Sequence, residues 1–348
     1  MKDRTKKTLK WTLISICSLL ILIVLTILIL LVLAYNKIYE QIPYVERESS
    51  YVMESKPEGI EYVSDESYTE DETSINETIS EAEKTPIYIK EPIDKNIINV
   101  LLVGRDVTQS SGSSGRSDSM MLLSYNKTTG EVTINSFLRD CYVPIEGHSW
   151  NRLNATYSIG GVGMTINTIN EIFDLDIQHY ISIDFNGFIG LIDKIDGVTI
   201  SITGVEAEYM NEHYSCGFTA GEVTLDGDTA LKFARIRKIA VSGGDFNRTE
   251  RQRRILVSAI NKMLNLNDIG KTISLINNGL EYVKTNLSSG NIISLTSDFV
   301  SKKNSDIKTG AIPAEGTWSY AMINRMSIID LNFDENKNIL HKRIYGDN

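Results

Sequence analysis

Arginine side chains gather in one short stretch of an otherwise acidic chain. Residues 233–256, FARIRKIAVSGGDFNRTERQRRIL, carry seven basic side chains against Asp245 and Glu250, although the 348 residues have a formal net charge of −10. The planar guanidinium presents a fork of donors that matches phosphate oxygens in bidentate fashion. This stretch therefore indicates a site for a phosphorylated anion. Its basic residues are Arg235, Arg237, Lys238, Arg248, Arg251, Arg253 and Arg254.

Helical periodicity predicts which of these charged side chains face inward and which face water. A helix is expected to begin near residues 245–247, after a Gly-Gly pair, and its apolar positions Leu256, Ala259 and Met263 define a buried face. Arg248 and Gln252 fall on that same face, which is unusual because burying an unpaired charge is costly. The pattern places the other charges beside or away from this face: Arg251 and Arg253 flank it, and Arg254 with Glu250 points to water. Arg235 and Arg237, two residues apart, share one side of an extended segment.

Further charges stand where predicted strands end. Strands are expected at 97–103, 120–125 and 132–138, with the turn 126–130, NKTTG, making the last two a hairpin. In an antiparallel meander the end of the first strand, the start of the second and the end of the third meet at one sheet edge. The residues at these places are Asp106, then Arg116 and Asp118, then Arg139 and Asp140. A Gly/Ser-rich loop, 110–114, connects the first two places and could close over a ligand.

Carboxylates beside arginines suggest a bridging metal. Mg²⁺ binds one or two carboxylates together with phosphate oxygens and water, so Asp106 and Asp118 are candidate ligands, with Mn²⁺ as the alternative ion. A pyrophosphate site of this kind acts mainly by positioning and charge stabilisation. Simpler interpretations remain: strand-end turn residues for the two aspartates, a surface ion pair for Arg139 and Asp140, and an exposed basic edge for Arg235 and Arg237.

The surrounding pattern predicts an α/β fold with a mixed central sheet flanked by helices. Alternating helices and strands point to this class. Helices are expected at 166–173, 185–195 and within 270–300, and strands near 179–183 and at 198–202. The tail, residues 314–348, could add a strand and a helix to the domain at 93–313.

The first residues read as a membrane anchor. Residues 11–34 carry no charge and are long enough to cross a bilayer core, and the basic segment 1–10 would stay in the cytoplasm. A cleaved signal peptide is the alternative, although the apolar run exceeds a normal signal core. Residues 35–92, rich in Glu, Ser and Thr, are expected to form an extended disordered stalk. The protein would then be a single-pass cell-membrane protein with its domain outside, where Cys141 and Cys216 could pair or stay free.

Several function classes are disfavoured. The acidic balance argues against nucleic-acid binding. The four histidines are scattered without zinc-ligand spacing, and no nucleophile elbow is visible.

The ordered motifs resemble the LytR-CpsA-Psr family. They are NVLLVGRDV, GRSDSMMLLSYN, INSFLRDCYVPI, NRLNATYSIGG, HYISIDFNGFIGLIDKIDGVTISI, LDGDTALKFARIRK and GGDFNRTERQRRIL, and they cover about residues 96–265. The resemblance implies an extracytoplasmic, membrane-anchored phosphotransferase of Gram-positive-type bacteria. It would move a teichoic acid, capsule or other wall glycan from a polyprenyl-pyrophosphate carrier to peptidoglycan and form a phosphodiester.

Residue by residue, the resemblance assigns roles. The metal-binding aspartates match Asp106 and Asp118, and the pyrophosphate-contacting residues match Arg116, Arg139, Arg235, Arg237, Arg248 and Gln252. The candidate catalytic set is Arg116, Arg139, Asp140 and Asp245. We infer for Asp245 a role in positioning or deprotonating the acceptor.

A lipid tail would need an apolar slot between sheet and helices. Its candidate lining residues are Phe173, Phe185, Phe188 and Ile189, for each of which ordinary core packing is the alternative. The chain departs from the family at Arg105, at Leu138 and at KIAVS after Arg237. The local loop shape and the glycan specificity are therefore not carried over from the family, whereas every charged residue of the site is present. A regulator that only binds polyprenyl pyrophosphate and a pyrophosphatase are the alternative functions.

Overall fold

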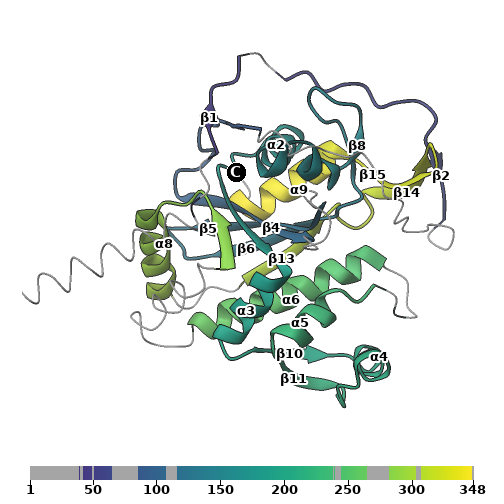
Figure 1. Ribbon diagram of the computed structural model, residues 1–348. Helices are drawn as coiled ribbons and strands as arrows, with labels where there is room; N and C mark the ends of the chain where they lie inside the picture. The colour runs from purple at the N-terminus through teal and green to yellow at the C-terminus, as the bar shows by residue number, and fades with distance from the viewer. Residues whose placement is uncertain are drawn as a thin grey trace, which may run out of the picture.

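A mixed sheet forms the centre of the computed structural model (Figure 1). The structure describes residues 39, 42–48, 51–64, 85–106, 116–237, 239, 244–264, 282–302 and 307–346. Within these residues the main sheet has six strands in the order β12-β9-β4-β5-β6-β13. Strands β4 (Ile97–Asp106), β5 (Arg116–Asn126) and β6 (Val132–Phe137) pair antiparallel in sequence order. The predicted meander and its hairpin are therefore confirmed.

Two parallel pairings make the sheet mixed. β9 (His179–Asp184) runs parallel to β4, and β13 (Ile307–Ile312) runs parallel to β6. The edge strand β12 (Val283–Thr285) pairs antiparallel to β9. The sequence pattern predicted a helix here, because a three-residue strand is too short to show the alternation that would identify it. Helix α8 (Ser289–Ser301) follows, and residues 265–281 lie outside the described residues.

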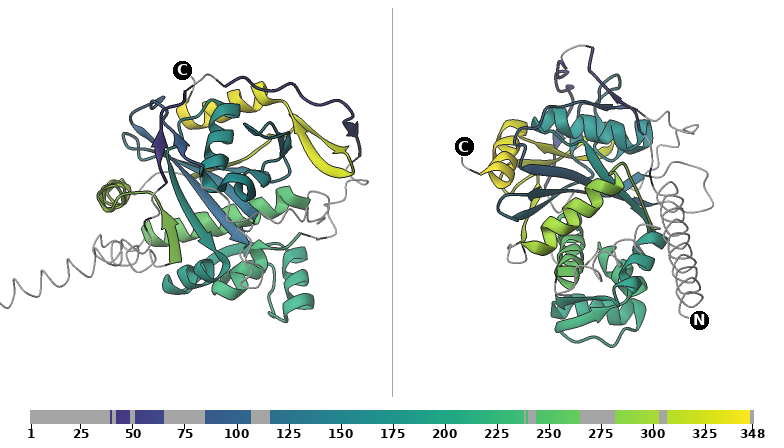
Figure 2. Two further views of the ribbon diagram at one scale, coloured as in Figure 1. Left: turned by 45° about the horizontal axis from the view of Figure 1, so that its top comes forward. Right: turned by 90° about the vertical axis from the view of Figure 1, so that its left-hand side faces the viewer.

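Helices cover both faces of the sheet (Figures 1 and 2). On one face lie α2 (Ala155–Phe173) and α9 (Phe333–Tyr345), and on the other lie α3 (Phe185–Lys194), α5 (Gly227–Ala234) and α6 (Gly244–Leu264). α2 begins eleven residues before the predicted helix (166 minus 155). Gly160 and Gly161 have non-helical backbone angles inside it, and this kink interrupts the apolar periodicity from which the helix was predicted.

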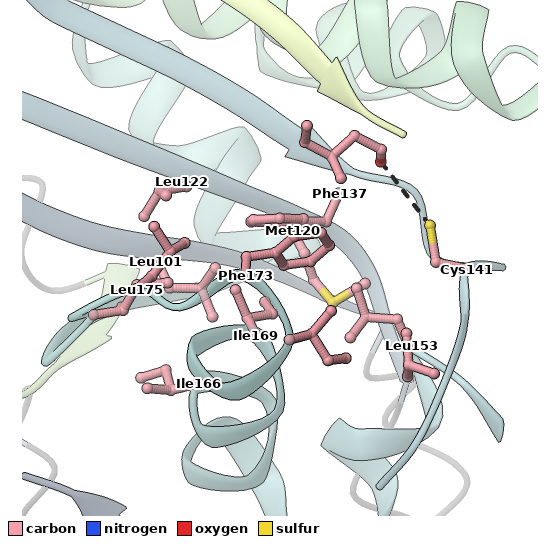
Figure 3. Packing of buried hydrophobic residues seen from close by; sticks show 14 of the residues in the cluster. Leu101, Met120, Leu122, Phe137, Cys141, Leu153, Ile166, Ile169, Phe173 and Leu175 are labelled. Atoms are coloured by element: carbon pink, nitrogen blue, oxygen red, sulfur yellow. Dashed lines mark hydrogen bonds between the residues drawn. The ribbon is translucent and has the colours of Figure 1, made fainter. Parts of the chain in front are cut away.

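The main core lies between the sheet and α2. Figure 3 shows Leu101, Met120, Leu122 and Phe137 of the sheet packed against Ile166, Ile169 and Phe173 of α2. A second core lies under α4 (Gly204–Tyr214) and the hairpin of β10 (Val198–Ile202) and β11 (Gly221–Leu225). The structure thus confirms the mixed α/β class.

The C-terminal residues are folded onto the domain. β14 (Trp318–Ile323) and β15 (Met326–Leu331) form a hairpin. Two short strands after β6, β7 (Tyr142–Val143) and β8 (Asn151–Arg152), lie next to it, with Ile329 N donating to the Asp140 carbonyl at 2.8 Å. Leu340 and Ile344 of α9 are buried in the main core.

The expected disordered stalk at 35–92 is wrong for its described parts. β1 (Tyr44–Val45) pairs with β3 (Ile87–Tyr88), and β2 (Glu61–Tyr62) pairs with β14. Ile42 and Ile87 are buried in the main core, so a few well-placed apolar residues outweigh the polar composition of the segment. The most acidic part, residues 65–84, lies outside the described residues.

The predicted segments 1–10 and 11–34 also lie outside the described residues. Among the helices that the structure does describe, none combines the length and apolar character needed to span a bilayer.

Candidate active site

Arg139 occupies the centre of a charged cluster at the end of β6. Its Nη1 donates to Asp118 Oδ1 at 3.1 Å. Its Nε lies 3.6 Å from Asp140 Oδ2 and 3.7 Å from Asp245 Oδ1. One of these carboxylates comes from β5, one follows β6 and one lies in the first turn of α6. The meander and α6 therefore bring together residues separated by more than a hundred positions.

Arg248 reaches the same cluster from the second turn of α6. Its guanidinium pairs with the Asp245 carboxylate, and its Nη2 donates to the Asp118 carbonyl at 3.3 Å. The side chain is only 3% exposed. Among the described residues, Nε and Nη1 of Arg248 and Oε1 of Gln252 have no hydrogen-bond partner. Buried groups without partners are costly and rare, so these atoms are suited to receive a ligand.

Asp140 is the most deeply buried acid of the cluster. Burial raises the pKa of its carboxyl, the neighbouring Arg139 lowers it, and Asp245 raises it again. Arg152 of β8 approaches from the other side, with Nη1 3.5 Å from Asp140 Oδ1, and its Nε donates to the Ser327 carbonyl at 2.7 Å. Asp140 thus links the site to β15.

Arg152 was missed as a functional residue in the sequence analysis. It lies within the motif NRLNATYSIGG, but a single arginine in a short irregular segment shows no periodicity that would turn it toward the site. Arg105 was likewise treated only as a departure from the family. Its guanidinium lies 4.0 Å from Asp184 Oδ2, at the end of β9.

Arg235 and Arg237 follow α5 and line the same cavity as Arg248. The Arg235 guanidinium stacks on the Phe185 ring at 4.8 Å from its centroid. Such stacking holds a guanidinium in place without consuming its donors. Most of the segment KIAVS, namely Lys238 and residues 240–242, lies outside the described residues, as does Gly243.

Two further arginines of α6, Arg251 and Arg254, have a different role. Arg251 Nε lies 2.8 Å and Arg254 Nη1 2.9 Å from Glu206 Oε1. Glu206 completes the capping box of α4 with Thr203, so the two arginines hold α4 against α6. The prediction that Arg254 points to water is wrong, because α4 supplies a buried carboxylate that a helical wheel cannot reveal.

Two predicted site residues are placed only by their backbone. Asp106 and Arg116 are opposite one another at the open end of the β4–β5 pair, close to the bulge at Gly104 and Arg105. Their side chains lie outside the described residues, as does the loop 107–115. The described His, Cys, Asp and Glu residues form no cluster of three or more that could hold a metal ion. Asp118, with one carboxylate oxygen bonded to Arg139, lies beside the cavity on the strand next to Asp106.

An apolar cavity of about 380 Å³ extends from this charged cluster. It lies between the sheet and helices α3, α5 and α6. Asp118, Asp184, Arg235, Arg237, Arg248 and Gln252 line it together with many apolar side chains, among them Leu102, Met121, Leu123, Ile181, Ile183, Leu256, Ala259, Ile260, Met263 and Val283. The cavity therefore joins a charged mouth to an apolar interior, which is the form of site that takes an amphipathic ligand.

Of the four residues predicted to line a lipid slot, two line the cavity and two do not. Phe185 and Phe188 line the cavity. Phe173 does not, because α2 lies on the other face of the sheet, where the Phe173 ring packs 5.4 Å from that of Phe137 (Figure 3). Ile189 is also outside the lining, since its backbone packs on Gly227 at the start of α5. Both corrections concern which face an element presents. Cys141 and Cys216 are free thiols.

Comparison with known proteins finds one matching family model and similar proteins of named function. The model of the LytR_cpsA_psr family matches residues 62–342. A polyisoprenyl-teichoic acid–peptidoglycan teichoic acid transferase, TagU, of Oceanobacillus iheyensis is 32% identical over 251 residues, which cover 67% of this chain and 75% of the relative. TagU of Bacillus subtilis is 31% identical over 65% of this chain and 71% of its own length.

Solved structures show the same fold. TagT bound to LIIa-WTA superposes with a TM-score of 0.60 at 25% identity and covers 76% of this chain and 97% of that structure. TagV of Bacillus subtilis gives a TM-score of 0.60 at 24% identity, over 74% of this chain and all of that structure. The chain belongs to the LytR-CpsA-Psr family.

Proposed function

We propose that this protein transfers a wall glycopolymer from a polyprenyl-pyrophosphate carrier to peptidoglycan. The observation that carries this proposal is the continuity of an arginine-lined mouth with an apolar cavity of about 380 Å³. A pyrophosphate with a long hydrocarbon tail has the same two-part chemistry. The names of the similar transferases support a teichoic acid as the polymer, with a capsule or another secondary wall glycan as the alternative.

The pyrophosphate would lie among the guanidiniums of Arg139, Arg235, Arg237 and Arg248. Arg139 and Arg248 are held in place by Asp118, Asp140 and Asp245, so little reorganisation is needed when charge develops. Preorganised donors of this kind stabilise developing negative charge in a site that excludes water. The unpartnered Nε and Nη1 of Arg248 are suited to bind phosphate oxygens.

The transfer would form one phosphorus–oxygen bond and break another. An acceptor hydroxyl on peptidoglycan attacks the phosphorus that carries the glycan, the bond from that phosphorus to the bridging oxygen breaks, and polyprenyl phosphate leaves. The hydroxyl proton passes to a base near the mouth. Asp245 is 4% exposed and pairs with Arg139 and Arg248, an arrangement better suited to orienting the arginines than to accepting this proton directly.

Mg²⁺ is the cation that we propose for the mouth, with Mn²⁺ as the alternative. Asp118 lines the cavity with one carboxylate oxygen bonded to Arg139, and Asp106 lies on the adjoining strand; carboxylates are the ligands that such an ion prefers. A bound divalent ion would neutralise phosphate charge next to the arginines. Arg116, opposite Asp106 in the strand register, would add a further cation.

The test is a transfer assay with a defined donor. A soluble form beginning at residue 36 keeps the packed segments β1, β2 and β3. It is mixed with Mg²⁺, a polyprenyl-pyrophosphoryl saccharide and peptidoglycan fragments, and mass spectrometry detects a phosphodiester-linked adduct. Arg139→Ala should abolish the adduct. The matched control is Arg325→Ala, an exposed arginine in the β14–β15 turn, which should leave the adduct unchanged.

Other outcomes identify the alternatives. Donor binding without any adduct from a panel of glycans would indicate a regulator that only binds the carrier. Release of glycan phosphate with water as the acceptor would indicate a pyrophosphatase. An Arg139→Ala protein that forms adduct at the unmodified rate would refute the mechanism.

A further inference from the structure

The first described residues of the chain lie at one edge of the main sheet. Tyr39 forms a parallel bridge with Thr285 of the edge strand β12. The Tyr44 hydroxyl donates to the Gln178 carbonyl at 2.8 Å and accepts from Asn286 Nδ2 at 2.6 Å. Ile42, between them, is 4% exposed in the main core. The chain is therefore fixed to the domain within a few residues of the predicted bilayer span at 11–34.

This attachment limits how far the domain can stand from a bilayer. Ala34 and Tyr39 are five residue steps apart, and a fully extended chain spans at most about 3.6 Å per step, or about 18 Å. Counted from Ala34 to the buried Ile42, the limit is about 29 Å. Either distance is small compared with the extended stalk that the composition of residues 35–92 predicted.

The acidic residues 65–84 cannot lengthen this connection. They join two points that are both fixed to the same domain. Before them, Val63 N donates to the Tyr320 carbonyl at 3.0 Å, and after them Thr85 N donates to the Gly160 carbonyl at 3.1 Å. Closer to the N-terminus, Arg47 holds its own segment on the domain by pairing with Glu171 at 2.9 Å and by stacking on the rings of Tyr51 and Tyr88.

The strand register connects this edge to the cavity. Tyr39 is paired with Thr285, Thr285 with Ile181, Ile181 with Leu102 and Leu102 with Met121, so the five residues form one row across the sheet. The last three line the apolar cavity. At about 4.8 Å between strands, Ile181 is only about 10 Å from the attachment point.

We propose that the sheet edge formed by β12, Tyr39 and residues 42–45 faces the lipid bilayer, so that the apolar cavity receives its ligand directly from the adjoining leaflet. This proposal rests on the function proposed above for the cavity and on the predicted span at 11–34. The partner of this surface is the lipid bilayer itself. The opposite edge, at β13, then faces away from the bilayer.

Two lysines make a matched pair for the test. Lys284 is exposed on β12, and Lys308 is 66% exposed on β13. Five inter-strand spacings separate these two edges, or about 24 Å. Lys284→Cys and Lys308→Cys are made singly in a full-length chain in which Cys17 and Cys216 are replaced by Ser, so that the buried Cys141 is the one native thiol left. Each is labelled with a donor dye and reconstituted into phosphatidylglycerol–phosphatidylethanolamine vesicles that carry an acceptor dye on the lipid headgroup.

Energy transfer to the bilayer should be at least about twofold more efficient from position 284 than from 308, given the strand spacing. A flexible insertion of 24 Gly and Ser residues between Asn36 and Lys37 adds an average reach of about 27 Å and should reduce this difference. Equal transfer from both positions, or stronger transfer from 308, would overturn the proposal. So would an insertion without effect, or a protein that fails to remain with the vesicles.

The readout separates this proposal from the proposed function. Energy transfer is measured without glycan donor or acceptor. A protein that shows the difference between positions 284 and 308 but transfers no glycan supports the orientation and argues only against the transferase. A protein that transfers glycan while both labels give equal signals refutes the orientation alone.

Discussion

Filling the apolar cavity should weaken binding of long-chain donors selectively. Ala259 lies on the inward face of α6 and lines the cavity. Ala259→Leu adds three carbons to that space. If each displaces one methylene of a bound tail, at about 0.8 kcal/mol per buried CH₂, the binding free energy falls by about 2.4 kcal/mol. This corresponds to an increase in Kd of about 60-fold.

The position of Ala259 provides an internal control. It lies seven residues after Gln252 on the same helix, which at 1.5 Å per residue is about 10 Å deeper in the cavity. A donor with a single isoprene unit is too short to reach it and should bind both proteins equally. Asn261→Leu, an exposed position on the same helix, should leave the affinity for either donor unchanged.

The assay is a titration of fluorescent donors of two tail lengths against the folded proteins. Circular dichroism and thermal melting establish that each variant is folded. The reasoning fails if Ala259→Leu binds the long donor as tightly as the unmodified protein. It fails equally if the short donor loses the same factor, because the effect would then arise at the mouth and not from the tail.

Four further outcomes are expected. Arg152→Met removes a buried partner of Asp140 and should lower the free energy of unfolding by about 3 kcal/mol, measured by urea titration. It should also lower kcat more than it changes KM. An unchanged kcat would show that Arg152 does not position Asp140 for catalysis. Burial raises the pKa of Asp140 above its ordinary value, so ionisation of this carboxyl destabilises the folded protein as the pH rises from about 4 through the raised pKa. Asp140→Asn does not ionise and should therefore become more stable than the unmodified protein over this pH interval. Thermal melting at a series of pH values measures the difference. Tyr345→Phe removes hydroxyl bonds to Asp176 at 3.1 Å and from Asn99 at 3.0 Å and should cost about 1–2 kcal/mol of stability without affecting kcat. Chelation should abolish glycan transfer and Mg²⁺ should restore it, whereas Asp118→Asn should need far more metal; transfer that persists in chelator would refute the metal proposal.

Local sequence patterns were sufficient to predict the three-stranded meander and the inward face of α6. The continuous apolar strands, their turn and the resulting meander are visible in the sequence because short hydrophobic runs bounded by turn residues permit few alternatives. The helical wheel also placed Arg248 correctly on the inward face of α6, where its side chain is 3% exposed. Asp118, Arg139 and Asp140 were predicted to meet, and the antiparallel pairing brings them within ion-pair distance.

The predictions for Arg254 and Phe173 failed, and Arg152 was missed, because a second helix or strand determines the surroundings of each side chain. The wheel sent Arg254 to solvent because it contains no information about Glu206, which arrives from α4. Phe173 has the size and hydrophobicity of a lipid-contacting residue, but the face of the sheet on which α2 lies assigns it to the other core. Arg152 gains its place only when β8 and β15 pack around Asp140.

The sequence by itself determined the three-stranded meander and the inward face of α6, and it indicated the chemical nature of the candidate ligand, because these depend on periodicity and side-chain chemistry within short windows. Only the tertiary structure decided where the cavity lies, which arginines serve the mouth and which hold α4, and that the described parts of the segment before residue 93 pack on the domain. Each of these depends on contacts between residues far apart in the chain. In the last case the burial of Ile42 and Ile87 outweighs a polar composition that, averaged over the segment, predicts disorder.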